Sequence, residues 1–177
     1  MKAAVRIVAV VGVGVLAGVL VWHLTHQPKS VQAAVAKGKV VRAPAFDLPL
    51  LTGSGKLSLV SLRGKVVVLN FWQSACGPCK EEMPRLEAAA QRWSGKNVVV
   101  VGVDMLDSRN AGRSFVKHYG ATYPMVFDAV ADTAAPYGVW NTPETFFLSP
   151  RGFIVKRVLG PVSSSGFDAG VRSALAT

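Results

Sequence analysis

Two cysteines, Cys76 and Cys79, are the only ones in this 177-residue chain, and Gly77 and Pro78 stand between them. They follow a β-branched and aromatic run, Lys65–Trp72, and open a stretch of helical periodicity. A cysteine at a helix N-terminus faces free backbone N–H groups and the positive end of the helix dipole, which favour thiolate over thiol. Because thiolate is the species that attacks disulfides, this placement predicts Cys76 as a redox nucleophile and Cys79 as the thiol that resolves the mixed disulfide.

A structural zinc half-site or two buried free thiols is the alternative interpretation of the cysteine pair. A zinc site would need two further ligands, but beyond residue 45 the sequence has one histidine, His118, and no other cysteine. The position of His118 near a predicted helix end assigns it an ordinary structural role. Redox chemistry is therefore the favoured interpretation, and no metal site is predicted.

The elements that must position the pair follow from hydrophobic periodicity. Continuous apolar runs indicate strands buried on both faces, and apolar residues at i, i+3 and i+7 indicate an amphipathic helix after the cysteines. Strands that alternate with helices predict an α/β fold with a partly parallel sheet, closed by an antiparallel hairpin at the edge. The predicted strands are Lys65–Trp72, Asn97–Val103, Met125–Phe127, Thr145–Leu148 and Phe153–Val158, and the predicted helices are Gly77–Trp93, one from a cap at Asp107 or Ser108 to Gly120, and one from about Ser163.

The charge distribution separates an N-terminal segment from the rest of the chain. The net charge is +10, and the first acidic residue is Asp47, so the six basic residues among residues 1–45 give that segment +6. The remaining 14 basic and 10 acidic residues give +4 with interspersed signs, which disfavours nucleic-acid binding because phosphates need a concentrated basic face. An apolar fraction of 50% argues against intrinsic disorder, and the length suits one core.

The run Ile7–Leu24 is eighteen residues long and carries no charge. At about 1.5 Å per residue it is just long enough to span about 30 Å of hydrocarbon. We therefore predict a membrane anchor at residues 1–24, a flexible linker at 25–43 and one folded domain at 44–177. A signal peptide cleaved at Ala34–Ala36 is the alternative, disfavoured because its apolar region would exceed the usual 7–15 residues. More basic residues follow the run than precede it, so the charge count alone places the domain inside the cytoplasm.

Stretches spread over residues 43–160 resemble one protein family. They read APAFDLPLL, LSLVSLRGKVVVLNFW, CGPCKEEMPRLE and YGVWNTPETFFLSPRGFIVKR. They look like the TlpA/ResA/CcmG (DsbE) group of membrane-anchored thioredoxin-like proteins. The resemblance implies a thioredoxin-like fold, a central mixed sheet flanked by helices, with an N-terminal addition and an inserted helix–strand unit at roughly 97–123.

The resemblance also implies roles for residues around the cysteine pair. Cys76 and Cys79 match the redox pair, and Pro143 matches a cis-proline that faces it. Thr142 matches the neighbouring position that offers its backbone to an extended substrate. Glu144, in the sequence PETF, matches the CcmG branch in particular.

Two acidic residues and one aromatic residue complete the candidate site. Glu82 matches an acid near the redox pair and lies three residues after Cys79, so both can share a helix face; an ordinary exposed helix glutamate is the alternative. Asp107 matches a second acidic position, with a simple helix cap as its alternative. Trp72 is counted among the candidate substrate-binding residues. It does not fill the place directly before the first cysteine, where the family usually has Trp and this chain has Ala75.

The function implied by the resemblance is reduction of the heme-binding CxxCH cysteines of apocytochrome c outside the cytoplasm, with electrons from a membrane carrier of the CcdA/DsbD type. Gly-Pro between the cysteines is the dipeptide of reducing thioredoxins and favours reduction. No cofactor beyond the disulfide is predicted. For the orientation we follow the family, because large C-terminal domains translocate largely regardless of flanking charge.

Three alternative functions differ from this prediction. A general extracytoplasmic disulfide reductase or oxidant would lack cytochrome specificity, and only the PETF sequence distinguishes it here. A peroxiredoxin is disfavoured because Gln73 stands three residues before Cys76, where Thr or Ser is expected. A copper-delivery protein on the same fold would want a CxxxC spacing and a paired histidine, whereas the spacing here is CxxC.

Overall fold

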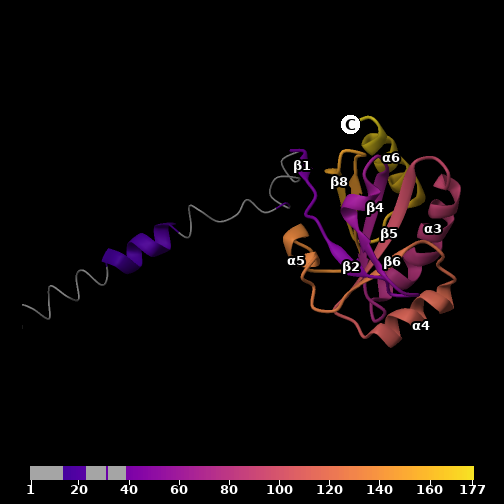
Figure 1. Cartoon of the computed structure of the whole chain (residues 1–177), viewed down its shortest axis with the longest axis horizontal. Helices are drawn as coiled ribbons and strands as arrows, with labels where there is room; N and C mark the ends of the chain where they lie inside the picture. The colour runs from indigo at the N-terminus through magenta and orange to yellow at the C-terminus, as the bar shows by residue number, and fades with distance from the viewer. Residues whose placement is uncertain (1–13, 23–30, 32–38) are drawn as a thin grey trace, which may run out of the picture.

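The computed structural model describes residues 14–22, 31 and 39–177. Of the predicted anchor at 1–24, it describes a helix at residues 14–22, and most of the predicted linker at 25–43 lies outside the described residues. Among the helices that are described, none combines the length and apolar character needed to cross a membrane. Figure 1 shows the folded domain that the remaining residues form.

The domain alternates strands and helices, as the sequence predicts. Its elements in chain order are β1 (Val41–Arg42), β2 (Asp47–Pro49), β3 (Lys56–Ser58), the 3-10 helix η1 (Leu59–Leu62), β4 (Val66–Trp72), α3 (Gly77–Trp93), β5 (Val98–Met105), α4 (Arg109–Tyr119), β6 (Met125–Asp128), α5 (Ala134–Tyr137), β7 (Glu144–Leu148), β8 (Phe153–Leu159) and α6 (Ser164–Leu175). All predicted strands and helices are present with ends within two residues of those predicted. The elements β1, β2, β3, η1 and α5 were not predicted. The region 97–123, where the resemblance places an inserted unit, holds β5 and α4.

The central sheet has six strands in the order β1-β8-β7-β4-β5-β6. Strand β5 lies parallel to β4 and β6, whereas β4–β7, β7–β8 and β1–β8 are antiparallel. The carboxyl end of β4 therefore lies in the middle of the sheet, and the cysteine motif follows directly from it. Strands β2 and β3 form a separate small sheet.

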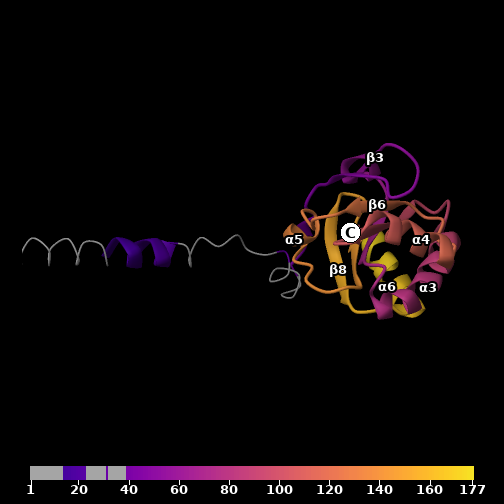
Figure 2. The same cartoon turned by 90° about the horizontal axis from the view of Figure 1, so that it is seen from below.

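Two hydrophobic clusters cover the two faces of the sheet. One contains residues of α3, α4 and α6, such as Met83, Phe115 and Phe167. The other packs η1 and α5 against the opposite face through residues such as Leu62 and Tyr137. Figure 2 shows the same layers, with α3 and α6 on one side of the sheet and β3 on the other. All seven residues of β4 are buried, so its end is held rigidly between the layers.

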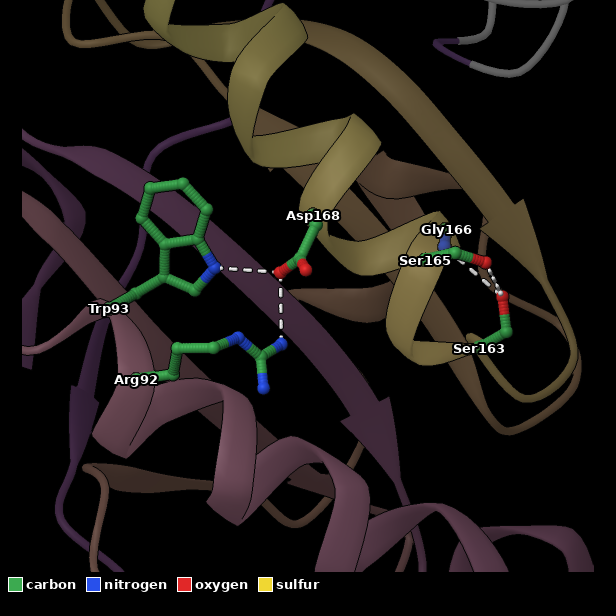
Figure 3. A network of polar contacts seen from close by, with 6 residues as sticks. All are labelled: Arg92, Trp93, Ser163, Ser165, Gly166 and Asp168. Carbon is green, nitrogen blue, oxygen red and sulfur yellow. Dashed lines mark hydrogen bonds and ion pairs between the residues drawn. The ribbon is translucent and has the colours of Figure 1, made fainter.

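Helix α3 begins at the cysteine motif and is fixed to α6 at its far end. Cys76 is its N-cap, and Pro78 stands in its first turn, where a missing N–H costs nothing. Near the C-terminal end, Trp93 Nε1 and Arg92 donate hydrogen bonds of 2.8 and 2.9 Å to Asp168 Oδ1 (Figure 3). The bond from Trp93, and then that from Arg92, lower the pKa of the Asp168 carboxyl. In the same view Ser163 caps α6 by accepting from the Gly166 N–H at 3.1 Å.

Candidate active site

The two cysteines are joined by a disulfide, with their Cα atoms 5.3 Å apart. Cys76 is half-buried, whereas Cys79 is only 2% exposed and belongs to the core cluster beneath α3. The Cys79 N–H donates a hydrogen bond of 3.1 Å to Cys76 Sγ, which directs one of the free N–H groups of the helix terminus at this sulfur. A thiolate on Cys76 would be stabilised by the same N–H group and by the helix dipole. A substrate sulfur can therefore reach Cys76, whereas the protein around Cys79 prevents it from reaching that sulfur.

Glu82 lies one turn after Cys79 and is buried, with 1% of its surface exposed. Its carboxylate accepts hydrogen bonds from Asn70 Nδ2, at 3.0 Å, and from the Val162 N–H. Asn70 Nδ2 also donates to Thr145 Oγ1 at 3.0 Å, so the network joins α3 to β4 and β7. Burial raises the pKa of Glu82, and the bonds from Val162 and Asn70 offset only part of that effect. Glu82 is thus a buried carboxyl of raised pKa on the helix that carries both cysteines.

The loop before β7 forms the other wall of the site. The Thr142–Pro143 peptide bond is cis, as the resemblance implies. Glu144, 2% exposed, forms an ion pair with Arg157 of β8. Burial raises the pKa of Glu144, while Arg157 lowers it in part. Glu144 is therefore a buried anchor of this loop, held by a neighbouring strand.

Two grooves meet at this loop. The first has a volume of about 260 Å³, and the residues that line it include Ala75, Cys76, Leu106, Trp140 and Thr142. The second groove, of about 320 Å³, shares Trp140 and Thr142 and continues along Pro143, Glu144, Arg157 and Leu159. A polypeptide that lies across Thr142 and occupies both grooves would therefore contact Trp140 and pass close to Cys76.

Trp140 is a site residue that the sequence analysis missed. Its side chain is 81% exposed, and Leu106, which lines the first groove with it, is 57% exposed. Exposed aromatic residues beside a groove mark binding surfaces, because tryptophan contributes strongly to interfaces. The aromatic surface that is missing at Ala75 is thus supplied by Trp140, which lines the same groove. An aromatic residue two positions before the Thr-Pro pair was the available signal.

Asp107 lies beside the cysteine loop and does not cap α4. Its Oδ2 accepts the Ser74 N–H at 2.7 Å, and its Oδ1 accepts the Ser108 N–H at 2.7 Å. The cap of α4 is Ser108, whose hydroxyl accepts from the Ala111 N–H at 3.2 Å. Asp107 therefore fixes the backbone two residues before Cys76.

The prediction that Trp72 binds substrate is wrong. Trp72 has no exposed surface, and its ring stacks on Phe115 of α4 with centroids 4.8 Å apart. It is the last residue of β4, a strand buried on both faces, so its side chain belongs to the core. Cys76, Thr142 and the grooves are brought together by the fold without it.

The sequence matches the model of the AhpC/TSA family over residues 41–157. Among characterised relatives, the thiol-disulfide oxidoreductase ResA of Bacillus subtilis is 32% identical over 152 residues, which are 84% of this chain and 85% of that protein. The thioredoxin-like protein YneN of the same organism is 32% identical over 142 residues, covering 78% of this chain and 81% of that protein.

Solved structures show the same fold. A DsbF homologue from Corynebacterium diphtheriae superposes with a TM-score of 0.70 at 29% identity and covers 77% of this chain and 88% of its own. A secreted Mycobacterium tuberculosis disulfide oxidoreductase homologous to E. coli DsbE gives 0.63 at 27% identity, with 72% and 95% covered. With the mixed sheet and the Cys76–Cys79 disulfide, these matches show that the chain belongs to the AhpC/TSA family and is a thioredoxin-like thiol–disulfide oxidoreductase related to ResA and DsbE.

Proposed function

We propose that this protein reduces disulfides of protein substrates through Cys76. The Cys76 thiolate attacks a substrate sulfur, a mixed disulfide forms and the other substrate sulfur leaves as a thiolate. The Cys79 thiolate then attacks Cys76 Sγ, which releases the second substrate thiolate and closes the Cys76–Cys79 disulfide. Two electrons pass from the pair to the substrate. The observation that carries this proposal is the contrast between the accessible Cys76 at the groove and the buried Cys79.

Glu82 is proposed to accept the proton that Cys79 must lose before the second attack. A buried thiol resists ionisation because desolvation disfavours the thiolate, so a base close by has most to contribute at this step. Glu82 is buried on the same helix, one turn away. Its pKa is raised toward the pH at which the protein works, and a proton acceptor is most effective when its pKa is close to that pH. Asn70 and the Val162 N–H hold it in place.

The substrate is proposed to lie extended across Thr142 and Pro143. Both grooves share Thr142, and Thr142 and Cys76 both line the first groove, which supports the substrate position that the family resemblance implies. The ion pair between Glu144, which follows Pro143, and Arg157 of β8 holds this end of the loop in place. Trp140 lines both grooves and supplies an apolar contact to the substrate in each.

The substrate class is proposed to be apocytochrome c, whose CxxCH cysteines must be reduced before heme attachment, with electrons resupplied by a membrane carrier of the CcdA/DsbD type. The PETF sequence and the similarity to ResA and DsbE support this choice. Heme-binding CxxCH proteins among the partners trapped on Cys76 would support it. A varied set of partners without them would favour a general disulfide reductase.

The domain is proposed to work on the extracytoplasmic side of the membrane, held by an anchor at residues 1–24. The eighteen-residue apolar run and the secreted relative from Mycobacterium tuberculosis support this location. In intact cells, a membrane-impermeant maleimide should label the reduced protein on Cys76, and the Cys76→Ser variant should remain unlabelled. Labelling that requires lysis would instead support the cytoplasmic orientation that the flanking charges favour.

A further inference from the structure

One end of the domain carries exposed basic side chains that the redox steps do not use. Arg63 follows η1, and Arg151 lies in the turn between β7 and β8; both are exposed. Arg63 donates a hydrogen bond to the Arg151 carbonyl, and a Cβ on Gly152 would collide with the Arg63 guanidinium. Arg151 in turn donates to the backbone oxygen of Thr177. The two arginines therefore lie on one surface, although 88 residues separate them in sequence.

The chain enters the domain at the same place, through β1, which lies beside β8 (Figure 1). Arg42 of β1 pairs in register with Phe153, and its guanidinium lies over the Phe153 ring at 4.9 Å. The next residue, Ala43, donates from its N–H to the Gly152 carbonyl at 3.0 Å. The exposed Arg42 thus joins the two arginines on one surface.

Two lysines and two aliphatic residues extend this surface. Lys65 follows Gly64, whose N–H donates to the Pro150 carbonyl of the β7–β8 turn at 3.0 Å. The basic surface is formed by five exposed side chains, Lys39, Arg42, Arg63, Lys65 and Arg151. Val40, which follows Lys39, and Val60, whose carbonyl accepts the Arg63 N–H at 3.2 Å, are exposed as well.

Acidic side chains are absent from the segments that form the basic surface. Residues 39–46, 58–66 and 149–154 contain no aspartate or glutamate. Eight of the ten acidic residues lie between residues 81 and 144, and the other two form ion pairs with basic residues outside this surface. The basic surface therefore keeps a positive potential, which attracts a negatively charged surface.

An anionic bilayer fits this surface in charge and in position. Only residues 25–38 separate Lys39 from the anchor proposed at residues 1–24, so the connection keeps the local concentration of lipid high. Basic clusters next to a membrane span bind anionic headgroups, and apolar side chains among them add contact with the interface. We propose that the basic surface docks on anionic phospholipid headgroups of the membrane that holds the anchor. This inference goes beyond the redox function but rests on the proposed anchor.

Docking on the basic surface points the redox site away from the bilayer. The β7–β8 turn lies beside the start of β4, because Leu148 pairs with Val67, whereas Cys76 follows the other end of β4. A strand of seven residues spans roughly 23 Å, at about 3.3 Å per residue. The grooves at Cys76 are then left open to protein substrates in the aqueous phase.

Paramagnetic relaxation in lipid nanodiscs tests the docked orientation. The full-length, nitrogen-15-labelled protein is placed in phosphatidylcholine discs, with or without phosphatidylglycerol, that carry a gadolinium-chelating lipid. In the anionic discs the backbone amide signals of Arg63 and Arg151 should broaden strongly, whereas those of Ala75 and Lys117 should not. Added salt should reverse the broadening, because salt screens the attraction between exposed charges.

Paired substitutions separate the charge of the basic surface from its structure. Each basic side chain near an anionic membrane contributes about fivefold to binding, so Arg63→Gln with Arg151→Gln should lower the docking equilibrium constant by about 25-fold. Arg63→Lys with Arg151→Lys keeps both charges without the guanidinium hydrogen bonds, so docking should persist. Arg85→Gln with Lys117→Gln is the matched control, since it removes the same charge from exposed positions on α3 and α4 and should leave docking unchanged.

Broadening at Arg63 and Arg151 that does not depend on phosphatidylglycerol, or broadening that is strongest at Ala75 or Lys117, would overturn the proposal. So would a control pair that lowers docking as much as the glutamine pair at Arg63 and Arg151. Protein that elutes apart from the discs would refute the anchor, and docking with it. None of these results bears on thiol exchange at Cys76, which the trapped partners test separately.

Discussion

Replacing Cys79 with Ser is expected to turn this protein into a covalent trap for its substrates. Cys76 would still attack a substrate disulfide, but no second sulfur would release the resulting mixed disulfide. Because Cys79 is buried and Cys76 lies at the groove, the variant retains the whole substrate-facing surface. Non-reducing gels of cells that produce Cys79→Ser should show covalent adducts that disappear when dithiothreitol reduces the mixed disulfide. Mass spectrometry should identify the trapped partners and show that they are bound to Cys76.

Cys76→Ser is the matched variant for this experiment. It keeps the core thiol but loses the sulfur at the helix N-terminus, so adducts should be nearly absent. The opposite result, in which Cys76→Ser accumulates adducts and Cys79→Ser does not, would reverse the two roles. It would also show that the helix N-terminus and the difference in burial do not decide which sulfur attacks.

Glu82→Gln is expected to slow the resolution step while leaving the first attack unchanged. A positioned proton acceptor contributes 100-fold or more to a proton transfer, so release of a mixed disulfide should slow by about 100-fold. The wild-type rate of release should increase with pH as Glu82 ionises, from the raised pKa that burial gives it. In the variant that increase should be absent until the Cys79 thiol ionises unaided. Stopped-flow decay of a fluorescent mixed disulfide on Cys76 measures both the rate of release and its dependence on pH.

The fold should tolerate this substitution. The folded-state pKa of Glu82 lies above its unfolded value, so the carboxyl favours the folded state at low pH and this contribution is lost as pH rises through the folded pKa. A glutamine does not ionise, so in Glu82→Gln this part of the stability is not lost as pH rises. Asn70 Oδ1, which has no partner among the described residues, can accept from a glutamine amide after a flip of the Asn70 side chain.

Glu87→Gln is the control on the same helix. Glu87 is also buried, but its bonds go to Thr122 and Gln91, away from the cysteines. Resolution in Glu87→Gln should proceed at the wild-type rate. An unchanged rate and pH profile in Glu82→Gln would remove Glu82 from the mechanism and leave it a structural role in joining α3 to β4.

The parts of the fold that the sequence predicts are those with a local signal. The apolar run of β4, the periodicity of α3 and the turn between β7 and β8 are each visible in a short window. Strands β1, β2 and β3 are two or three residues long, and β1 is defined by pairing with β8, more than one hundred residues away. No local pattern specifies the β1–β8 pairing, and β2 and β3, which pair with each other, are too short to show the alternation that identifies a strand.

The residues of the candidate site also fall into two groups, those that local spacing could assign and those that it could not. The redox pair and Glu82 lie within seven residues of one helix, so spacing was enough to place them together. Trp140 lies in the groove beside Cys76 and Leu106, which are distant from it in sequence, so spacing could not assign it to the site. Trp72 could have been excluded, because the pattern that predicts β4 is that of a strand buried on both faces. Its closeness to the motif in sequence outweighed that evidence.

The reduction potential of the Cys76–Cys79 couple is the most direct test of reductive function. Equilibration of the full-length protein with dithiothreitol buffers, followed by quantification of alkylated thiols, measures it. The Gly77-Pro78 dipeptide, shared with reducing thioredoxins, predicts a value near that of thioredoxin, about −270 mV. A protein with this potential donates electrons to substrate disulfides whose reduction potential is higher than its own. A value near that of DsbA, about −120 mV, would contradict this conclusion and make the protein an oxidant.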